Sequence, residues 1–133
     1  MIFVDTSALF ALANRGDLYH KQARKALERL ESSGETLLTH NYVVVESAAL
    51  IHTRLGRASA YKFLREASEF TVRWVSSEQH EEAVREFETR GSANVSFVDV
   101  VSFLIMRAEG ITAYFGYDEH FTIAGFQPVQ TEE

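Results

Sequence analysis

The segment MIFVDTSAL, residues 1–9, decides how the rest of the chain is organised. Residues 2–4 (IFV) have the β-branched and aromatic composition of a strand covered on both faces, as strands of parallel sheets are. Asp5 follows this run, and Thr6 and Ser7 lead into the helix-forming stretch SALFALAN. The segment predicts a strand, a turn and a helix, with Asp5 at the edge where open α/β sheets bind ligands. An Asp before a helix is also a common N-cap, so Asp5 alone leaves both interpretations open.

The length and composition indicate an ordinary globular domain. The chain has 133 residues, 46% hydrophobic and 24% charged, with one Pro and no Cys. This is close to the commonest domain size, and no linker or repeat divides it, so we expect a single domain spanning residues 1–133. The absence of Cys excludes disulfide scaffolds and thiolate chemistry.

The N-terminus does not have the pattern of a secretory signal. Its first thirteen residues are apolar but lack a basic region, and Asp5 interrupts them. No stretch approaches the roughly 18 uninterrupted apolar residues that a membrane span needs. We therefore expect a cytoplasmic protein with no membrane partner.

The net charge limits how the protein can interact with nucleic acid. With 13 Lys and Arg against 19 Asp and Glu, the formal charge is −6 at pH 7. Such a chain does not hold nucleic acid by bulk electrostatics, so any contact with phosphates must be local. Carboxylates gathered in one cavity would repel phosphate unless a divalent cation is bound between them.

Strand-like and helical segments alternate along the whole chain. Further strands are expected at 36–39, 70–75 and 112–115, with a short edge strand at Pro128 and Val129. Helices are expected at 18–33, 41–56, 57–69, 78–89 and from Ser96 to about Gly110. This order predicts an α/β protein, a three-layer α/β/α fold with a largely parallel central sheet of four to five strands.

Glu46 is a candidate functional residue because it interrupts an apolar helical stripe. In HNYVVVESAALIHTRLG, residues 40–56, Asn41 is the expected N-cap, and apolar residues surround Glu46. An ionised carboxylate buried there is costly unless it is paired or coordinates a metal. The alternative is a Glu at the rim that reaches solvent or Arg54.

Two further acids stand at element ends. Ser96 and Asp99, in SFVDVVSFLIM, have the spacing of a capping box, and an acid in the first turn is stabilised by the helix dipole. A cation in front of that helix could still use Asp99. Asp118 follows the strand expected at 112–115 in the same way that Asp5 follows the first strand.

These acids are expected to converge, because right-handed crossovers bring the carboxyl ends of parallel strands to one edge. Clustered carboxylates repel one another, and hard divalent cations with oxygen ligands relieve that repulsion. With Mg²⁺ or Mn²⁺ bound, such a site suits phosphodiester hydrolysis. We expect such a cluster to consist of Asp5, Glu46, Asp99 and Asp118.

The basic and histidine residues are less informative. Lys21, Lys25 and Arg29, with Arg24 beside them, form a stripe on the helix at 18–33 that is either a solvated face or a phosphate track. His20 and His40 are expected at loops or helix ends rather than on a metal, because neither has a second ligand at suitable helical spacing.

At these residues the chain resembles the PIN-domain ribonucleases, most closely the VapC-type toxins of bacterial and archaeal toxin–antitoxin pairs. The resemblance is carried by VDTSAL, the acid in VVVESAALI, SFVDVVSFLIM and FGYDEHF, and it covers essentially the whole chain. It implies a metal-dependent ribonuclease whose catalytic carboxylates are Asp5, Glu46, Asp99 and Asp118. Of these, Asp5, Asp99 and Asp118 are implied as metal ligands, and the hydroxyls of Thr6, Ser7 and Ser96 are implied to lie near the substrate. It also implies a homodimer, an RNA substrate and a small antitoxin with a basic segment. Many of these toxins carry Ser or Thr where this chain has Gly116.

Three alternatives were weighed. A haloacid-dehalogenase-type phosphatase needs an Asp at the position of Ser7. A response-regulator receiver needs a central Asp and a late Lys, but no Asp lies between Asp17 and Asp99, and no Lys follows Lys62. The third is a non-catalytic PIN-like module whose acidic cavity docks a basic peptide, and only divalent-dependent RNA cleavage would separate it from a nuclease.

Overall fold

The chain folds around a five-stranded sheet, in a computed structural model that describes residues 1–89 and 94–129. The strand order is β3-β2-β1-β4-β5, and every pairing is parallel. The strands are β1 (Ile2–Val4), β2 (Leu37–His40), β3 (Thr71–Arg73), β4 (Ala113–Phe115) and β5 (Gln127–Pro128). This confirms the predicted sheet, with the short edge strand as its fifth member.

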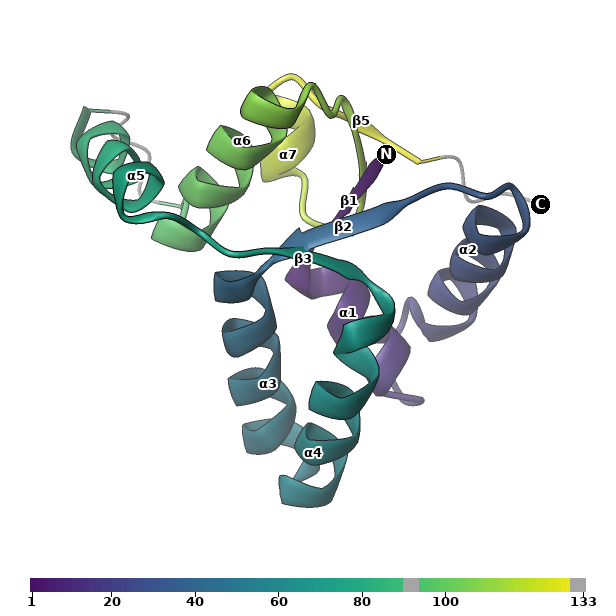
Figure 1. The fold of residues 1–133 in the computed structure, drawn as a ribbon. Coiled ribbons are helices and arrows are strands. Elements are labelled where there is room, and N and C mark those ends of the chain that lie inside the picture. Colours follow the sequence, from purple (N-terminus) through teal and green to yellow (C-terminus); the bar gives the residue numbers. More distant parts are fainter. Residues whose placement is uncertain (90–93, 130–133) are drawn as a thin grey trace.

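Helices cover both faces of the sheet, which confirms the three-layer fold. In Figure 1, α6 and α7 lie on one face and α1, α3 and α4 on the other, while α2 packs on α1 and α5 packs on α6. Their bounds are α1 (Thr6–Ala13), α2 (His20–Ser32), α3 (Asn41–Leu55), α4 (Arg57–Glu66), α5 (Ser77–Thr89), α6 (Phe97–Glu109) and α7 (His120–Ile123), with a 3-10 turn, η1 (Ala67–Glu69), after α4.

The order in which strands are added to the sheet reverses at β1: β2 and β3 extend the sheet on one side of it, and β4 and β5 extend it on the other. β1 pairs with β2 on one side and β4 on the other, so that Ile2 is the partner of both Leu37 and Ala113. The connections from β1 through β3 use one helical layer, and those from β3 through β5 use the other. Open parallel sheets bind their ligands at the carboxyl ends of the strands beside such a switch point. Asp5 lies there, and its N–H donates to the carbonyl of Phe115 at 3.0 Å.

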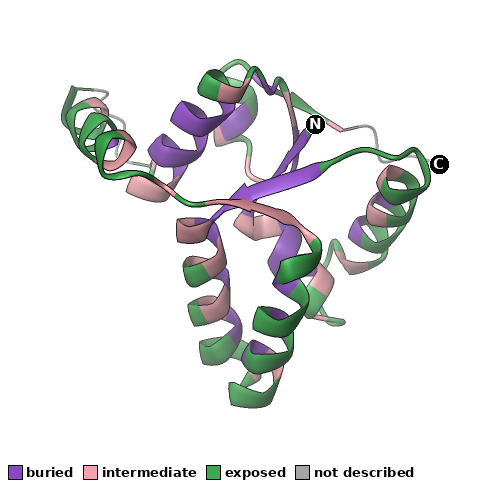
Figure 2. Cartoon of the chain, in the orientation of Figure 1, coloured by how far each residue is buried: buried purple, intermediate pink, exposed green. Residues whose placement is uncertain are grey.

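The core fills the space between the sheet and α6, α7 and α1. Figure 2 shows β1, β2 and much of α6 buried, while the outer sides of α2, α4 and α5 are exposed. Phe121 of α7 is fully buried and stacks near Phe3 of β1 with 5.9 Å between ring centroids. This anchor fixes the short helix that follows Asp118, so the end of the chain is positioned by the same core as the first strand.

Several helix starts differ from the sequence prediction. The N-cap of α3 is His40, whose ring accepts from Val43 N–H, whereas the side chain of Asn41 accepts from Val75 N–H at 2.7 Å. Helix α2 begins at His20 rather than Leu18, because Asp17 accepts from the backbone of Tyr19 and forms a turn. Helix α7 was not predicted, since four residues are too short for a periodic pattern.

Within residues 1–89 and 94–129, we find no helix whose length and apolar character would let it cross a bilayer.

Candidate active site

One cavity at the carboxyl edge of β1 and β4 is lined by all seven site residues expected from the sequence, which are the four acids and the three hydroxyl residues Thr6, Ser7 and Ser96. The cavity has a volume of about 410 Å³. Its lining comes from the starts of α1 and α6, from α3, and from the segment after β4. The lining residues are Asp5, Thr6, Ser7, Glu46, Leu50, Asn94, Ser96, Asp99, Asp118 and His120. The four acids, which are far apart in the sequence, are therefore brought to one place, although their chemical roles remain a proposal.

Asp5 both caps α1 and faces the cavity, so the two interpretations from the sequence are compatible. Its side chain accepts from the N–H of Ser7 at 3.4 Å and from the Ser7 hydroxyl at 3.0 Å. The same hydroxyl oxygen accepts from the N–H of Tyr117 at 2.7 Å. Ser7 thus links the end of β1 to the segment that carries Asp118, and it fixes the orientation of the Asp5 carboxylate.

Burial makes Asp5 an unusual carboxyl group. Asp5 is 4% exposed, and this desolvation, together with the charge of Asp99, raises its pKa to about 7. The hydrogen bonds from Ser7 and the backbone of Thr6 oppose the shift but do not cancel it. Desolvation and like charges favour the neutral form of an acid, and such shifts are concentrated at functional sites.

Asp99 has the predicted capping role and a second set of contacts. The hydroxyl of Ser96 accepts from Asp99 N–H at 3.1 Å, and Asp99 Oδ2 accepts from Ser96 N–H at 3.4 Å, which completes the capping box. Burial, and then the charge of Asp118, raise the pKa of Asp99, while the Ser96 N–H and His120 oppose that shift. A carboxylate needed only as a cap does not have to be buried beside another acid.

His120 is the site residue that sequence reasoning missed. Its Nδ1 lies 3.0 Å from Asp118 Oδ1 and 3.3 Å from Asp99 Oδ2, and its N–H donates to Asp118 Oδ1 at 2.9 Å. The only signal in the sequence was its position two residues after Asp118, in YDEHF. Asn94 and Leu50 also line the cavity without having been predicted.

Glu46 is half-buried at the cavity wall and is paired with a hydroxyl. Thr6 Oγ1 donates to Glu46 Oε1 at 2.6 Å, which joins the first turn of α1 to the middle of α3. Arg54, the alternative partner, instead lies over the ring of Phe10, with 5.9 Å from its guanidinium carbon to the ring centroid. The carboxylate of Glu46 therefore belongs to the cavity rather than to a pair with Arg54.

The other two histidines considered earlier lie at helix starts, as expected. The ring Nδ1 of His20, the first residue of α2, lies 2.7 Å from the carbonyl of Ala11. His40 is fully buried, with Nε2 2.9 Å from the Ser102 hydroxyl, and burial lowers its pKa to about 3. Since His40 Nδ1 accepts from Val43 N–H, the proton of the neutral ring is on Nε2.

The donor set fits a divalent cation. Asp99, Asp118 and His120 each offer a ligand atom, and these three atoms lie within 4.8 Å of one another. Asp5 adds a carboxylate whose pKa is raised first by burial and then by the neighbouring charge of Asp99. An ion between such groups would offset both the repulsion and the desolvation, which is the usual reason for clustered carboxylates.

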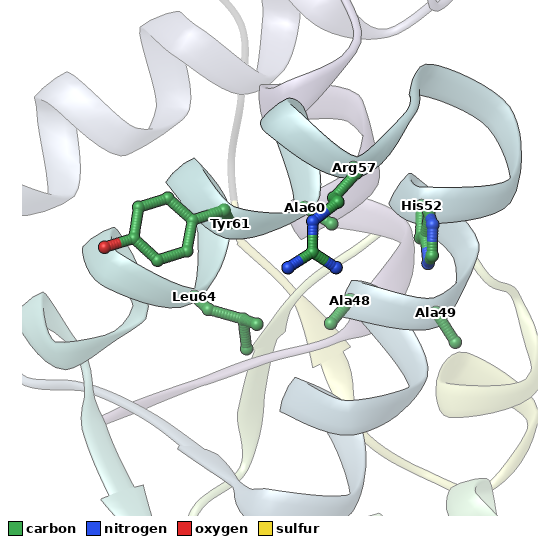
Figure 3. A pocket seen from close by; sticks show the side chains of 7 residues that line it. All are labelled: Ala48, Ala49, His52, Arg57, Ala60, Tyr61 and Leu64. Carbon is green, nitrogen blue, oxygen red and sulfur yellow. The ribbon is translucent and has the colours of Figure 1, made fainter.

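A second cavity, of about 280 Å³, lies between α3 and α4. Figure 3 shows its lining side chains, which are Ala48, Ala49, His52, Arg57, Ala60, Tyr61 and Leu64. None of these residues is acidic and most of the lining is apolar, so this cavity offers no site for a hard cation.

Comparison with known proteins agrees with the fold. The PIN domain family matches residues 2–126. The chain is 34% identical, over 134 aligned residues that span 99% of this chain and all of the relative, to the 23S rRNA-specific endonuclease VapC20 of Mycobacterium tuberculosis strains CDC 1551 and H37Rv. The crystal structure of Mycobacterium tuberculosis VapC20, a sarcin–ricin loop cleaving toxin, superposes with a TM-score of 0.83 at 33% identity, covering 95% of this chain and 96% of that one. The chain belongs to the PIN-domain family.

Proposed function

We propose that this protein is a divalent-metal-dependent endoribonuclease and the toxin of a toxin–antitoxin pair, formed as one PIN domain over residues 1–133. The observation that carries the proposal is the convergence of Asp5, Glu46, Asp99 and Asp118 on one cavity. The similarity of this chain to a ribosomal RNA endonuclease, over the full length of that relative, supports the ribonuclease activity. We further propose that it acts in the cytoplasm.

Asp5, Asp99 and Asp118 would hold a Mg²⁺ or Mn²⁺ ion, with His120 as an additional donor. When bound, the ion lowers the pKa of a water molecule and offsets negative charge on the scissile phosphate. The other residues orient these ligands: Ser96 holds Asp99 through the capping box, and Ser7 holds Asp5 through its hydroxyl.

Glu46 would take a proton from the attacking water. Thr6 donates to its Oε1, and among the described residues no hydrogen bond to its Oε2 is seen, so Oε2 would accept that proton. The water oxygen would bond to phosphorus as it loses this proton, the bond from phosphorus to the bridging oxygen would break, and the leaving oxygen would take up a proton from solvent water. No serine, cysteine or histidine nucleophile is required for this reaction.

The proposed substrate is single-stranded or looped RNA. Unstacked strands can bring a phosphate into a recessed cavity, whereas a rigid duplex holds its phosphates away from it. The sarcin–ricin loop, which VapC20 cleaves, is the first substrate to test.

The decisive test compares wild type with Asp5→Asn and Glu46→Gln on a sarcin–ricin loop hairpin and on unstructured RNA. Each variant should lose cleavage while its circular dichroism spectrum stays that of wild type, and EDTA should abolish wild-type activity. Full activity of Asp5→Asn, or of wild type in excess EDTA, would contradict the proposal. Binding of a basic peptide without any cleavage would instead favour the docking module.

We also propose two protein partners, a second copy of this chain and a small antitoxin whose Arg or Lys side chain enters the acidic cavity. An inserted cation can neutralise carboxylates that otherwise wait for metal. Purification from the native host should yield a complex of a dimer with a small basic-tailed protein, measured by light scattering. Recovery of a bare monomer would contradict both partners.

A further inference from the structure

Helix α2 presents a basic surface on a protein that is acidic overall. Lys21, Arg24 and Lys25 are all exposed in its first two turns, and we call these three residues the α2 basic face. In the part of the chain that the structure describes, no ion pair engages any of the three. Their charges are therefore available to a ligand, although the net charge of the chain is −6.

The stability of the helix does not explain why these cations are there. The first turn of α2 contains no acidic residue, and its N-cap, Tyr19, makes no side-chain capping hydrogen bond. The N-terminal end of a helix carries partial positive charge and favours anions, so Lys21, in the first turn, is at the unfavourable end of α2. Asp17, which accepts from Tyr19 N–H just before the helix, is the carboxylate that lies there. An anionic ligand bound to Lys21 would offset its unfavourable interaction with the helix dipole.

The residue directly before α2 contacts the segment that carries Asp118. The ring of Tyr19, directly before α2, stacks on the ring of Tyr117 with 4.3 Å between centroids and 5° between planes. Tyr117 precedes Asp118, and its N–H donates to Ser7, which in turn donates to Asp5. Two aromatic rings thus connect the start of α2 to the wall of the cavity.

We propose, on the basis of the proposed function, that the α2 basic face binds the phosphate backbone of single-stranded RNA and leads it to the acidic cavity. RNA is the occupant that the charges select, because a basic antitoxin segment would be repelled there. Tyr19, which is 40% exposed, offers a ring on which a base can stack beside the cations. The α2 basic face would thus supply local phosphate contacts on a protein that is acidic overall.

The salt dependence of RNA binding tests this assignment. For a single strand, the logarithm of the affinity falls with the logarithm of salt concentration by about 0.7 per phosphate neutralised. The variant Lys21→Gln with Arg24→Gln should therefore reduce the slope by about 1.4. Binding is measured by fluorescence anisotropy of a short labelled RNA in EDTA, and the RNA is checked for integrity afterwards.

A matched control is available on α4. Lys62 and Arg65 have the same residue types and spacing, are exposed, and lie on the helix that packs against α3. Lys62→Gln with Arg65→Gln should leave the slope unchanged. The swap Lys21→Arg with Arg24→Lys changes both side chains but keeps both charges, so it should keep the wild-type slope. A reduced slope in the Gln variant is then assigned to the lost charges rather than to substitution at these positions.

Three outcomes would contradict RNA binding by the α2 basic face: an equal loss of slope in the α2 and α4 double variants, an unchanged slope in the α2 double variant, or no RNA binding by wild type. These outcomes are separate from those of the cleavage test. Cleavage by wild type with an unaltered slope in the α2 variant would support the proposed nuclease and contradict the RNA-binding surface. A reduced slope without cleavage would support the surface and contradict the nuclease.

Discussion

Gly116 lies directly against Asp5. A β-carbon added to Gly116 would be 3.1 Å from the β-carbon of Asp5 and 3.1 Å from the hydroxyl of Ser7. Many of the toxins that the chain resembles have Ser or Thr here. In this chain the glycine leaves room for the contact between Ser7 and Asp5, and Asp118 lies beside Asp99 and His120.

Gly116→Ala should therefore disturb the site. The added methyl group must displace Asp5 or Ser7 by a few tenths of an ångström, and overpacking of this kind destabilises proteins by about 1–3 kcal/mol. We expect a lower melting temperature and reduced RNA cleavage. Gly16→Ala is the control, because its β-carbon would meet only Asn14 Oδ1, at 3.5 Å. Wild-type melting and activity in Gly116→Ala would contradict the crowding argument.

The buried carboxyl group of Asp5 should make the stability of the metal-free protein depend on pH. Its pKa is raised from 3.8 to about 7 in the folded state, so the folded protein holds a proton that the unfolded chain releases. The contribution is fully present below pH 3.8 and is lost as the pH rises through 7, with a slope of at most about 1.4 kcal/mol per pH unit. Urea unfolding in EDTA between pH 4.5 and 7.5, about three pH units, measures it.

The free energy of unfolding of wild type must be compared with that of Asp5→Asn, because His40 changes the stability with pH in the opposite direction. Its folded pKa is lowered from 6.5 to about 3, so its contribution is present above 6.5 and lost as the pH falls through 3. Both proteins keep His40, and subtracting their stabilities removes its effect. The difference should fall with rising pH, and a flat difference would show that Asp5 is not desolvated.

The carboxylate cluster should destabilise the protein without metal, and Asp99→Asn should raise the melting temperature in EDTA. Asn can still accept from Ser96 N–H, while the charge of Asp99, which adds to burial in raising the pKa of Asp5, is gone. Mg²⁺ at a hundredfold excess over its dissociation constant should stabilise wild type by about 2.7 kcal/mol and the variant by much less.

Six melting curves, for wild type, Asp99→Asn and a control variant, each in EDTA and in Mg²⁺, decide this point. Glu82→Gln, an exposed acid on α5, is the control and should behave as wild type in both buffers. An Asp99→Asn variant that melts lower in EDTA and gains as much from Mg²⁺ would show that Asp99 serves only as a helix cap.

His120 should affect the choice of metal. Imidazole is a good ligand for transition metals, whereas Mg²⁺ takes oxygen ligands almost exclusively. His120→Asn should weaken Mn²⁺ binding by at least about tenfold, since even outer-shell changes cost that much, and should leave Mg²⁺ binding nearly unchanged. Affinities are measured by calorimetry, with Mn²⁺ checked by electron paramagnetic resonance.

The control for the metal measurement is His52→Asn, a histidine that lines the cavity between α3 and α4. It should bind both ions as wild type does. Equal losses for Mn²⁺ and Mg²⁺ in His120→Asn would mean that His120 orients Asp99 and Asp118 rather than contacting the ion.

The sequence by itself determined the elements whose signals are local. The apolar run before Asp5 specifies β1, and Ser96 with Asp99 specifies the start of α6, because strand composition and helix capping depend on neighbours within a few residues. The alternation of such signals also determined the parallel sheet and its helical layers. Asp5, Asp99 and Asp118 could each be placed at an element end for the same reason, whereas Glu46 was placed within a helix.

Only the tertiary structure decided which of these ends meet. The contact of Gly116 with Asp5, the approach of His120 to Asp99, and the raised pKa of Asp5 all depend on β4 lying beside β1. Strand order is set by the packing of the whole core, in which Phe121 locks the last short helix against Phe3. No periodic pattern within one segment predicts that packing, because the residues in contact come from opposite ends of the chain.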